Sequence, residues 1–133
     1  MDPLTLDESL RMLAAARAKA EEKSIKVAIA ILDPRGDIVA LHRMDGALWR
    51  CVPISQGKAA ASAAWNIPSV ELQERWNQPV FQSLSTMENG RLIPWQGALP
   101  VRRDDGTMVG AIGVSGAKAS DDEEVAEAGL HAL

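Results

Sequence analysis

The chain has 133 residues, of which 47% are apolar, and it carries a formal net charge of -4 with a single cysteine. Such a length and composition are typical of one domain, here residues 1–133, which buries about two-thirds of its unfolded surface without disulfide support. Lys and Arg are scattered along the chain, which excludes the basic stripe of a nucleic-acid-binding protein.

The N-terminal segment predicts a helix over about residues 6–23. Thr5 and Glu8 have the spacing of a capping box, in which the two side chains bond backbone amides that a helix start leaves unpaired. Leu6, Leu10, Leu13 and then the small Ala14, Ala18 and Ala20 predict one apolar stripe along this helix. We expect that stripe to face the core.

Residues 26–32 and 38–41 predict an antiparallel hairpin, because both runs are rich in β-branched residues. Between them, the segment Asp33-Pro34-Arg35-Gly36 has Asp, Pro and Gly at the positions that a type I turn favours. The two strands are therefore expected to pair directly.

The middle of the chain predicts a second helix over residues 54–65, with Pro53 at its first helical position. The segment Asn66-Ile67-Pro68 ends this helix. Residues 69–88 are ambiguous. Their pattern favours a short helix over about residues 70–76, followed by a break and a doubtful strand.

Residues 99–103 and 107–115 flank Asp104-Asp105-Gly106 and predict a second hairpin. Ser120 and Glu123 have the spacing of another capping box, which predicts the start of a C-terminal helix. Hairpins separated by helices indicate an α+β domain with one mostly antiparallel sheet covered by helices.

The location of the protein is predicted from two negative features. No apolar run approaches the roughly 20 residues that a membrane-spanning helix requires. Asp2 and Pro3 follow Met1 without the basic and apolar regions of a signal peptide. We therefore expect a cytoplasmic protein with no membrane partner.

Ser115 lies in a Gly-Val-Ser-Gly turn that nearly fits a nucleophile elbow. The second glycine comes one position early, and the only bases available would be His42 and His131. A structural serine is therefore favoured over a hydrolase triad. The strand glycines Gly110 and Gly113 indicate close approach of another backbone or of a flat ligand.

Four consecutive carboxylates, residues 121–124, follow this turn. Backbone amides at the turn could hold an anion, but the carboxylates already occupy that positive field. Asp121 and Glu124 share a helix face and could bind a cation. We expect a solvated helix start and no metal site.

Several blocks of sequence, which together span nearly the whole chain, form a pattern. The most specific is Val109–Gly116 with Asp121 beyond it. The weaker blocks are Leu4-Thr5-Leu6, Val27–Asp33 with Gly36, Leu41–Gly46, Lys58-Ala59 and Leu99-Pro100-Val101. With these blocks the chain resembles the GlcG/HbpS-type haem-binding family.

The resemblance implies a profilin-like or PAS-like fold with a five-stranded antiparallel sheet flanked by helices, assembled into homo-oligomers. Other members of that family are the C-terminal domain of some cobalamin adenosyltransferases and small proteins encoded in catabolic operons. Where members commonly carry a glycine triplet, this chain has Trp95-Gln96-Gly97-Ala98. That change predicts a reshaped ligand pocket.

Haem is the cofactor that the resemblance implies. Its iron takes an axial His, Cys, Met or Tyr, and Tyr is absent. His42 is the first candidate, and strand alternation places it on the face of Ala40 and Met44. Cys51 and Met87 are the other candidates.

A small catabolic enzyme of the isomerase, lyase or hydrolase type is the alternative function. Arg43 and Lys58 would be its catalytic cations for a carboxylated or aromatic substrate. Asp45 and Glu88 could act as acid or base. Without a substrate, Arg43 would form a salt bridge and Lys58 would be a solvated helix residue.

The remaining candidates would bind a small ligand directly. The segment Trp95-Gln96-Gly97 is expected to set specificity, Trp49 to form a pocket wall, and Ser115 to reach the ligand. A non-catalytic assembly or chaperone module is the third class of function. It predicts a filled pocket, with the tryptophans buried between subunits.

Overall fold

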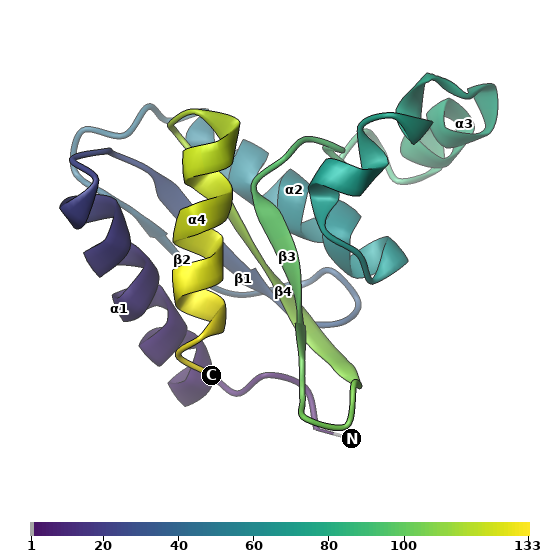
Figure 1. Ribbon diagram of the computed structural model, residues 1–133. Helices are drawn as coiled ribbons and strands as arrows, with labels where there is room; N and C mark the ends of the chain where they lie inside the picture. The colour runs from purple at the N-terminus through teal and green to yellow at the C-terminus, as the bar shows by residue number, and fades with distance from the viewer. Residues whose placement is uncertain (1) are drawn as a thin grey trace.

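The computed structural model describes residues 2–133 (Figure 1). Its helices are α1 (Leu6–Glu22), α2 (Cys51–Trp65), α3 (Pro79–Met87) and α4 (Ala119–Leu130), with the short 3-10 helices η1 (Ser69–Leu72) and η2 (Arg75–Asn77). Its strands are β1 (Ala28–Leu32), β2 (Ile38–Arg43), β3 (Ala98–Arg102) and β4 (Met108–Ser115). The predicted α+β class is confirmed.

The four strands form one antiparallel sheet in the order β2-β1-β4-β3. Each predicted hairpin supplies two neighbouring strands. The long-range pairing of β1 with β4, in which Ala28 lies opposite Ser115, joins the hairpins at the centre of the sheet. A fifth strand is wrong for residues 2–133. The segment that was expected to hold a doubtful strand folds as α3 instead.

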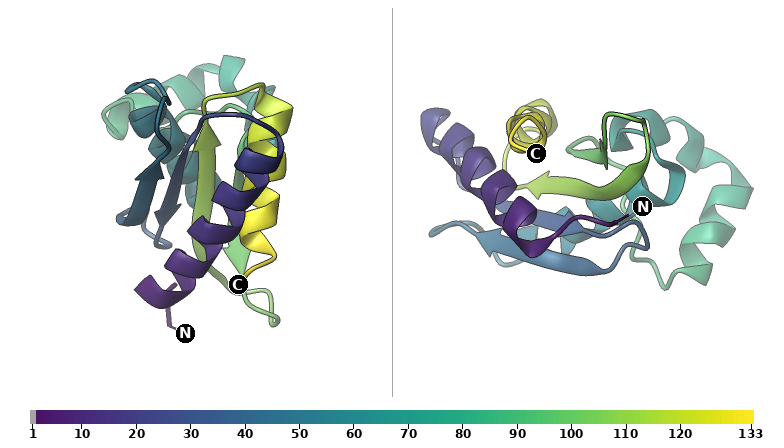
Figure 2. Two further views of the ribbon diagram at one scale, coloured as in Figure 1. Left: turned by 90° about the vertical axis from the view of Figure 1, so that its left-hand side faces the viewer. Right: turned by 90° about the horizontal axis from the view of Figure 1, so that it is seen from below.

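The helices cover both faces of this sheet. In Figure 2, α1 and α4 lie side by side on one face and α2 lies on the other. Residues such as Met12, Ile29 and Ile112 fill the core between α1, α4 and the sheet. The opposite core, under α2, is built largely from alanines, because a helix lined with small residues can approach the sheet closely.

The expected stripe of α1 is only partly correct. Met12, Leu13 and Ala16 are buried, but Leu6 is 55% exposed and Leu10 is 43% exposed. The core face of α1 is the one that packs on both α4 and the sheet. This face includes Leu13 but is rotated away from Leu6 and Leu10. Packing against α4 thus decided which of two apolar faces became the core face.

Two helix starts also differ from expectation. α2 begins at Cys51, so Pro53 lies within its first turn. Backbone N–H groups of the first turn have no acceptor within the helix, so the missing N–H of proline costs no hydrogen bond there. α4 begins at Ala119 and has no side-chain capping bond, so the second predicted capping box is wrong. The capping box of α1 is confirmed by the reciprocal bonds of Thr5 and Glu8.

The segment from Trp65 to Ile93 packs on α2 and projects from the domain (Figure 1). The predicted short helix is split into η1 and η2, and an aromatic cluster of Trp65, Trp76 and Phe81 attaches α3, with ring centroids 5.4 to 5.7 Å apart. The chain then crosses α2 at Gly57, where a Cβ would lie 2.5 Å from the Ile93 side chain. Glycine is therefore required at this crossing.

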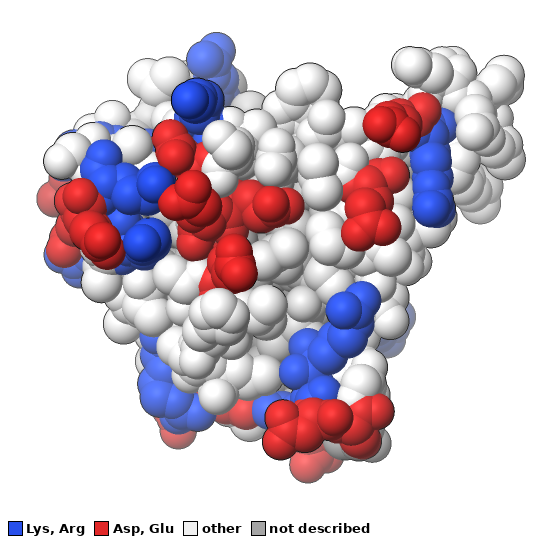
Figure 3. Space-filling view, viewed as in Figure 1, with Lys and Arg blue, Asp and Glu red and all other residues white. Residues whose placement is uncertain are grey.

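Charged side chains are intermixed on the face that Figure 3 shows, over α1 and α4. Lys23 at the end of α1 pairs with Asp121 and Glu124 of α4, at 3.3 and 2.6 Å. These ion pairs account for two of the four carboxylates that open α4.

Glu8 forms a bidentate ion pair with Arg103, which joins α1 to the second hairpin. The Arg103 hydrogen bonds, followed by the Thr5 amide, lower the pKa of Glu8 from 4.5 to about 2. A carboxyl whose pKa is depressed on folding stabilises the fold above its unfolded pKa, and this contribution is lost as the pH falls toward 2.

We expect Glu8→Gln to lower the free energy of unfolding by about 1 kcal/mol at neutral pH, since glutamine keeps the capping box but loses the ion pair. The difference from the parent protein should vanish as the pH falls from about 5 to about 2. Urea unfolding across this range measures it. Glu22→Gln, on the exposed face of the same helix, is the control and should change stability little. A difference that does not vary with pH would contradict the prediction.

Candidate functional site

A buried ion pair lies at the end of the sheet where β3 begins and β4 ends. Lys58 Nζ, from α2, lies 2.9 Å from Asp122 Oδ2, from α4. It also donates to the Val114 carbonyl at 3.0 Å. The two side chains are only 4% and 2% exposed. The ion pair thus joins α2 and α4, which lie on opposite faces of the sheet, at the end of β4.

The second Asp122 oxygen accepts the Ala117 amide at 3.0 Å, so both oxygens are bonded. Burial raises the pKa of the Asp122 carboxyl, and the charge of Lys58 opposes this rise. The expectations of solvated carboxylates and a solvated Lys58 are therefore wrong for this pair.

Helical periodicity could have singled out Asp122 in the sequence. It shares one face of α4 with Val125, Ala126 and Gly129, all of which are buried, at spacings of three, four and seven residues. The neighbouring carboxylates fall on other faces. Its partner had no comparable signal, because most residues of α2 around Lys58 are buried on every side.

Gly97 lies directly beside the pair. A Cβ here would lie 2.8 Å from Lys58 Nζ and 2.7 Å from the Val114 carbonyl oxygen, and φ is +136°. Only glycine fits both the space and the backbone conformation. The expected ligand-binding glycine therefore has a packing role next to the pair.

The neighbouring residues of this segment are held by hydrogen bonds. The backbone N–H of Gln96 donates to the side-chain oxygen of Gln73 at 2.6 Å, and the side-chain amide of Gln96 donates to Glu123 at 3.2 Å. The Ser69 hydroxyl donates to the Trp95 carbonyl at 2.6 Å. The Gln96 side chain is therefore bonded to α4.

An open hollow of about 340 Å³, here called the Lys58 hollow, lies over the pair. Its walls include Ile54, Lys58, Trp95 and Ser115. Trp95 is 55% exposed and its indole can contact a ligand, whereas Ser115 is buried. Neither histidine lines this hollow, and Lys58 and Asp122 are bonded to each other, so Ser115 has no imidazole base and a structural role of this serine is favoured.

His42 and Arg43 lie elsewhere, in an open groove of about 270 Å³ between α1 and β2. This His42 groove also has walls from Arg17, Lys26 and Met44. His42 pairs across the sheet with Ile29, which belongs to the core under α1, so its imidazole is on that face. The two proposed catalytic cations, Arg43 and Lys58, therefore line different hollows.

The remaining candidates are dispersed. Trp49 is 76% exposed and lines neither hollow, Cys51 is buried, and Met87 is exposed on α3. Among the residues that the structure describes, no three His, Cys, Asp or Glu side chains gather as metal ligands. Within residues 2–133, no helix combines the length and apolarity that crossing a bilayer requires.

Residues 4–131 match the family described as haem degrading protein HbpS-like. A protein of 15.0 kDa from the dhaT-dhaS intergenic region of Citrobacter freundii is 29% identical over 128 residues, which are 96% of this chain and 89% of that protein. The corrinoid adenosyltransferase PduO of Citrobacter freundii is 27% identical over 132 residues. Those residues are 98% of this chain but only 39% of PduO.

The solved structures that share the fold include the following three. Klebsiella pneumoniae ORFY has a TM-score of 0.90 and 28% identity, with 99% of this chain and 91% of that chain covered. A variant of Streptomyces reticuli HbpS has a TM-score of 0.87 and 30% identity, with 100% and 88% covered. A PduOC:heme complex has a TM-score of 0.87, with 98% and 95% covered. At 24% identity, it shows a common fold alone.

The buried pair predicts a pH-dependent defect. Lys58→Met would leave the Asp122 charge buried without a cation, which should lower the free energy of unfolding by about 3–5 kcal/mol at neutral pH. Because burial raises the pKa of Asp122, lowering the pH protonates it and relieves the defect. Urea unfolding at about pH 7 and about pH 5 measures this recovery.

Two variants test the cause of that defect. Lys58→Met/Asp122→Asn removes the buried charge and should be more stable than Lys58→Met at neutral pH. Lys26→Met, a change at an exposed lysine, should be close to the parent. If Lys58→Met lost the same free energy at both pH values, the ion pair would not be the cause.

Proposed function

Because the chain belongs to the family described as haem degrading protein HbpS-like, we propose that it binds haem in the His42 groove, as a homo-oligomer. The observation that carries this proposal is the grouping of an accessible imidazole with three cations in one open groove, whose two carboxylates, Glu21 and Asp45, leave it with a net positive charge. Haem requires both an axial ligand and cations for its propionates. The solved PduOC:heme complex, which has the same fold, supports the same ligand class.

The possible axial ligands differ in what surrounds them. Cys51 is buried, so its sulfur is shielded from an approaching macrocycle. Met87 and His131 are accessible but lie outside the groove, on α3 and just after α4. His42 has Met44 two residues away on the same strand face, and both line the groove. His42 is therefore the proposed axial ligand.

The groove also supplies charge for the propionates. Arg17 already pairs with Glu21 at 2.9 Å. Lys26 and Arg43 form no ion pair with any side chain of residues 2–133, so they are the cations proposed to hold the two propionates. This assignment gives Arg43 a binding role in place of the expected catalytic one.

The shape of the groove limits how haem would lie there. At about 270 Å³ it is smaller than the 300–1,000 Å³ of typical ligand pockets, and it is open to solvent. The residues can therefore position one edge and the iron of the macrocycle, while the rest extends beyond the groove. Bound haem would supply a redox-active iron, and His42 would set its orientation.

The alternative of a small-molecule enzyme stays a prediction. Lys58 is already bonded to Asp122 and Val114, and Arg43 lines a different hollow, so the two cations do not form one carboxylate clamp within a subunit. Of the ligand-binding candidates, Trp95 and Ser115 remain together in the Lys58 hollow. An assembly module also stays a prediction.

Titration of the protein with hemin tests the proposal. We expect saturable one-to-one binding with a shifted Soret band, and a loss of affinity of about tenfold or more in His42→Ala. His131→Ala is the matched control, because it removes the other histidine from outside the groove. Lys26→Gln and Arg43→Gln should each weaken binding by less than His42→Ala.

The same titration can exclude the proposal. Unsaturable binding that is the same in the parent, His42→Ala and His131→Ala would mean that hemin adsorbs without a site. Equal losses in both histidine variants would point away from the groove. Either result would exclude the His42 groove as the haem site.

Self-association is proposed through the exposed face of α1. Leu6, Leu10 and Ala14 follow one another at four-residue spacing on this face and are all exposed. Light scattering on the purified protein should give a mass of at least two subunits, and Leu10→Glu should lower it. Val80→Glu, at an exposed apolar residue of α3, should not. A monomeric parent protein would contradict this proposal.

A further inference from the structure

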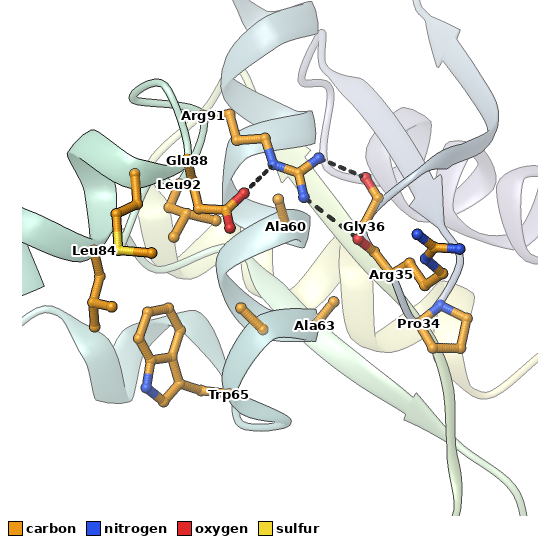
Figure 4. A pocket seen from close by; sticks show the side chains of 12 residues that line it. Pro34, Arg35, Gly36, Ala60, Ala63, Trp65, Leu84, Glu88, Arg91 and Leu92 are labelled. Atoms are coloured by element: carbon orange, nitrogen blue, oxygen red, sulfur yellow. Dashed lines mark hydrogen bonds and ion pairs between the residues drawn. The ribbon is translucent and has the colours of Figure 1, made fainter.

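A separate cavity of about 210 Å³ lies between α2 and α3 (Figure 4). This α3 pocket is closed by Arg91 on one side and by the turn Pro34–Gly36 on another. It shares no lining residue with the His42 groove or the Lys58 hollow. Neither the predicted haem site nor the buried ion pair accounts for it.

The body of the pocket is apolar. Its floor is the outer surface of α2, where Ala60, Ala63 and Ala64 replace longer side chains and leave a flat surface. Trp65 and Leu84 form a wall (Figure 4). The Trp65 ring packs on Trp76 and Phe81 at 5.6 and 5.7 Å, so this wall is held in place by the aromatic cluster.

The rim of the pocket is charged. Arg91 forms three long hydrogen bonds, at 3.3 Å to Glu88 and at 3.4 Å to the carbonyls of Gly36 and Arg35. The Arg35 guanidinium has no hydrogen-bond or ion-pair partner within the described chain. The lining contains two guanidinium groups, those of Arg35 and Arg91, and one carboxylate, that of Glu88, so it carries one net positive charge.

We propose that the α3 pocket binds a single-ring aromatic carboxylate. A dry apolar cavity of about 150 Å³ is enough to bind benzene, so about 210 Å³ accommodates one ring and a small polar substituent. The ring lies on the alanine floor against Trp65. The carboxylate lies at the rim, where Arg35 offers two parallel N–H donors and Arg91 can exchange its long bonds for shorter ones.

The placement of α3 allows such a ligand to enter. α3 packs mainly on η2 and does not form part of the layers that cover the sheet. The pocket between α2 and α3 is partly open to solvent, so a ligand can enter it without movement of α3. Glu88 repels a second negative charge, which favours a monocarboxylate over a dicarboxylate.

Benzoate and benzyl alcohol are the probes for this proposal, with binding followed in 1H–15N correlation spectra. The expected result is saturable benzoate binding with a dissociation constant of about 1 mM or tighter. It should shift the amides of residues 60–65 and 84–92 and the Trp65 indole N–H, which Trp65→Phe identifies. Benzyl alcohol, which has the ring but no carboxylate, should bind about tenfold more weakly.

Two variants separate the floor from the rim. Ala64→Leu fills the floor and Arg35→Gln removes the unpartnered cation, and each should weaken benzoate at least about tenfold. Ala132→Leu, at a partly exposed alanine after α4 that lines none of these sites, is the matched control and should leave binding unchanged. Arg35→Gln should not weaken benzyl alcohol.

Several outcomes would overturn the proposal. Absence of saturation, shifts confined to residues near Trp95 or His42, or benzoate affinity equal in Ala64→Leu and the parent would each exclude the pocket. Equal affinity for benzoate and benzyl alcohol would exclude the carboxylate contact. The result is independent of hemin binding, because the two sites share no residue.

Discussion

The ion pair between Lys58 and Asp122 is the contact on which the arrangement of this domain depends. It joins α2 on one face of the sheet to α4 on the other, around the end of β4, and it is almost fully shielded from water. A charge at this depth is tolerated only when its partner and its remaining hydrogen bonds are in place. Val114 and Ala117 complete those bonds. Lys58 leaves no space for a Cβ at position 97, so Gly97 cannot be replaced by another residue without a clash. The Trp95–Ala98 segment lies beside the pair.

The His42 groove, the α3 pocket and the Lys58 hollow follow from how the helices are distributed over the sheet. α1 covers only part of the β1–β2 side, which leaves the His42 groove open at its edge. α2 crosses the opposite face, and its small residues allow the Trp65–Ile93 segment to run over it with a cavity beneath. The Lys58 hollow lies where these layers meet. Ligand chemistry therefore differs from hollow to hollow: an imidazole with cations, an apolar pocket with a charged rim, and a neutralised ion pair beside an indole.

The sequence indicated which residues could bind a ligand, but not which of them would lie together in one site. Strand alternation placed His42 and Met44 on one face, and both line the same groove. Arg43 and Lys58 both carry positive charge, but the sequence contains no information on which element each would contact. The fold buries one against a carboxylate and leaves the other at an edge. The α3 pocket was not predicted, because its walls come from three segments with no shared motif.

The sequence by itself determined the local elements and the class of the fold. Turn residues, capping groups and β-branched runs act over a few positions, so both hairpins, the three longer helices and the α+β class could be predicted directly. The resemblance in the Val109–Gly116 block likewise indicated the family. Only the tertiary structure decided that Leu6 and Leu10 would be exposed, that residues 79–87 would be helical and that Lys58 would be buried. Each of these depends on packing between segments distant in the chain, where long-range contacts override local preference.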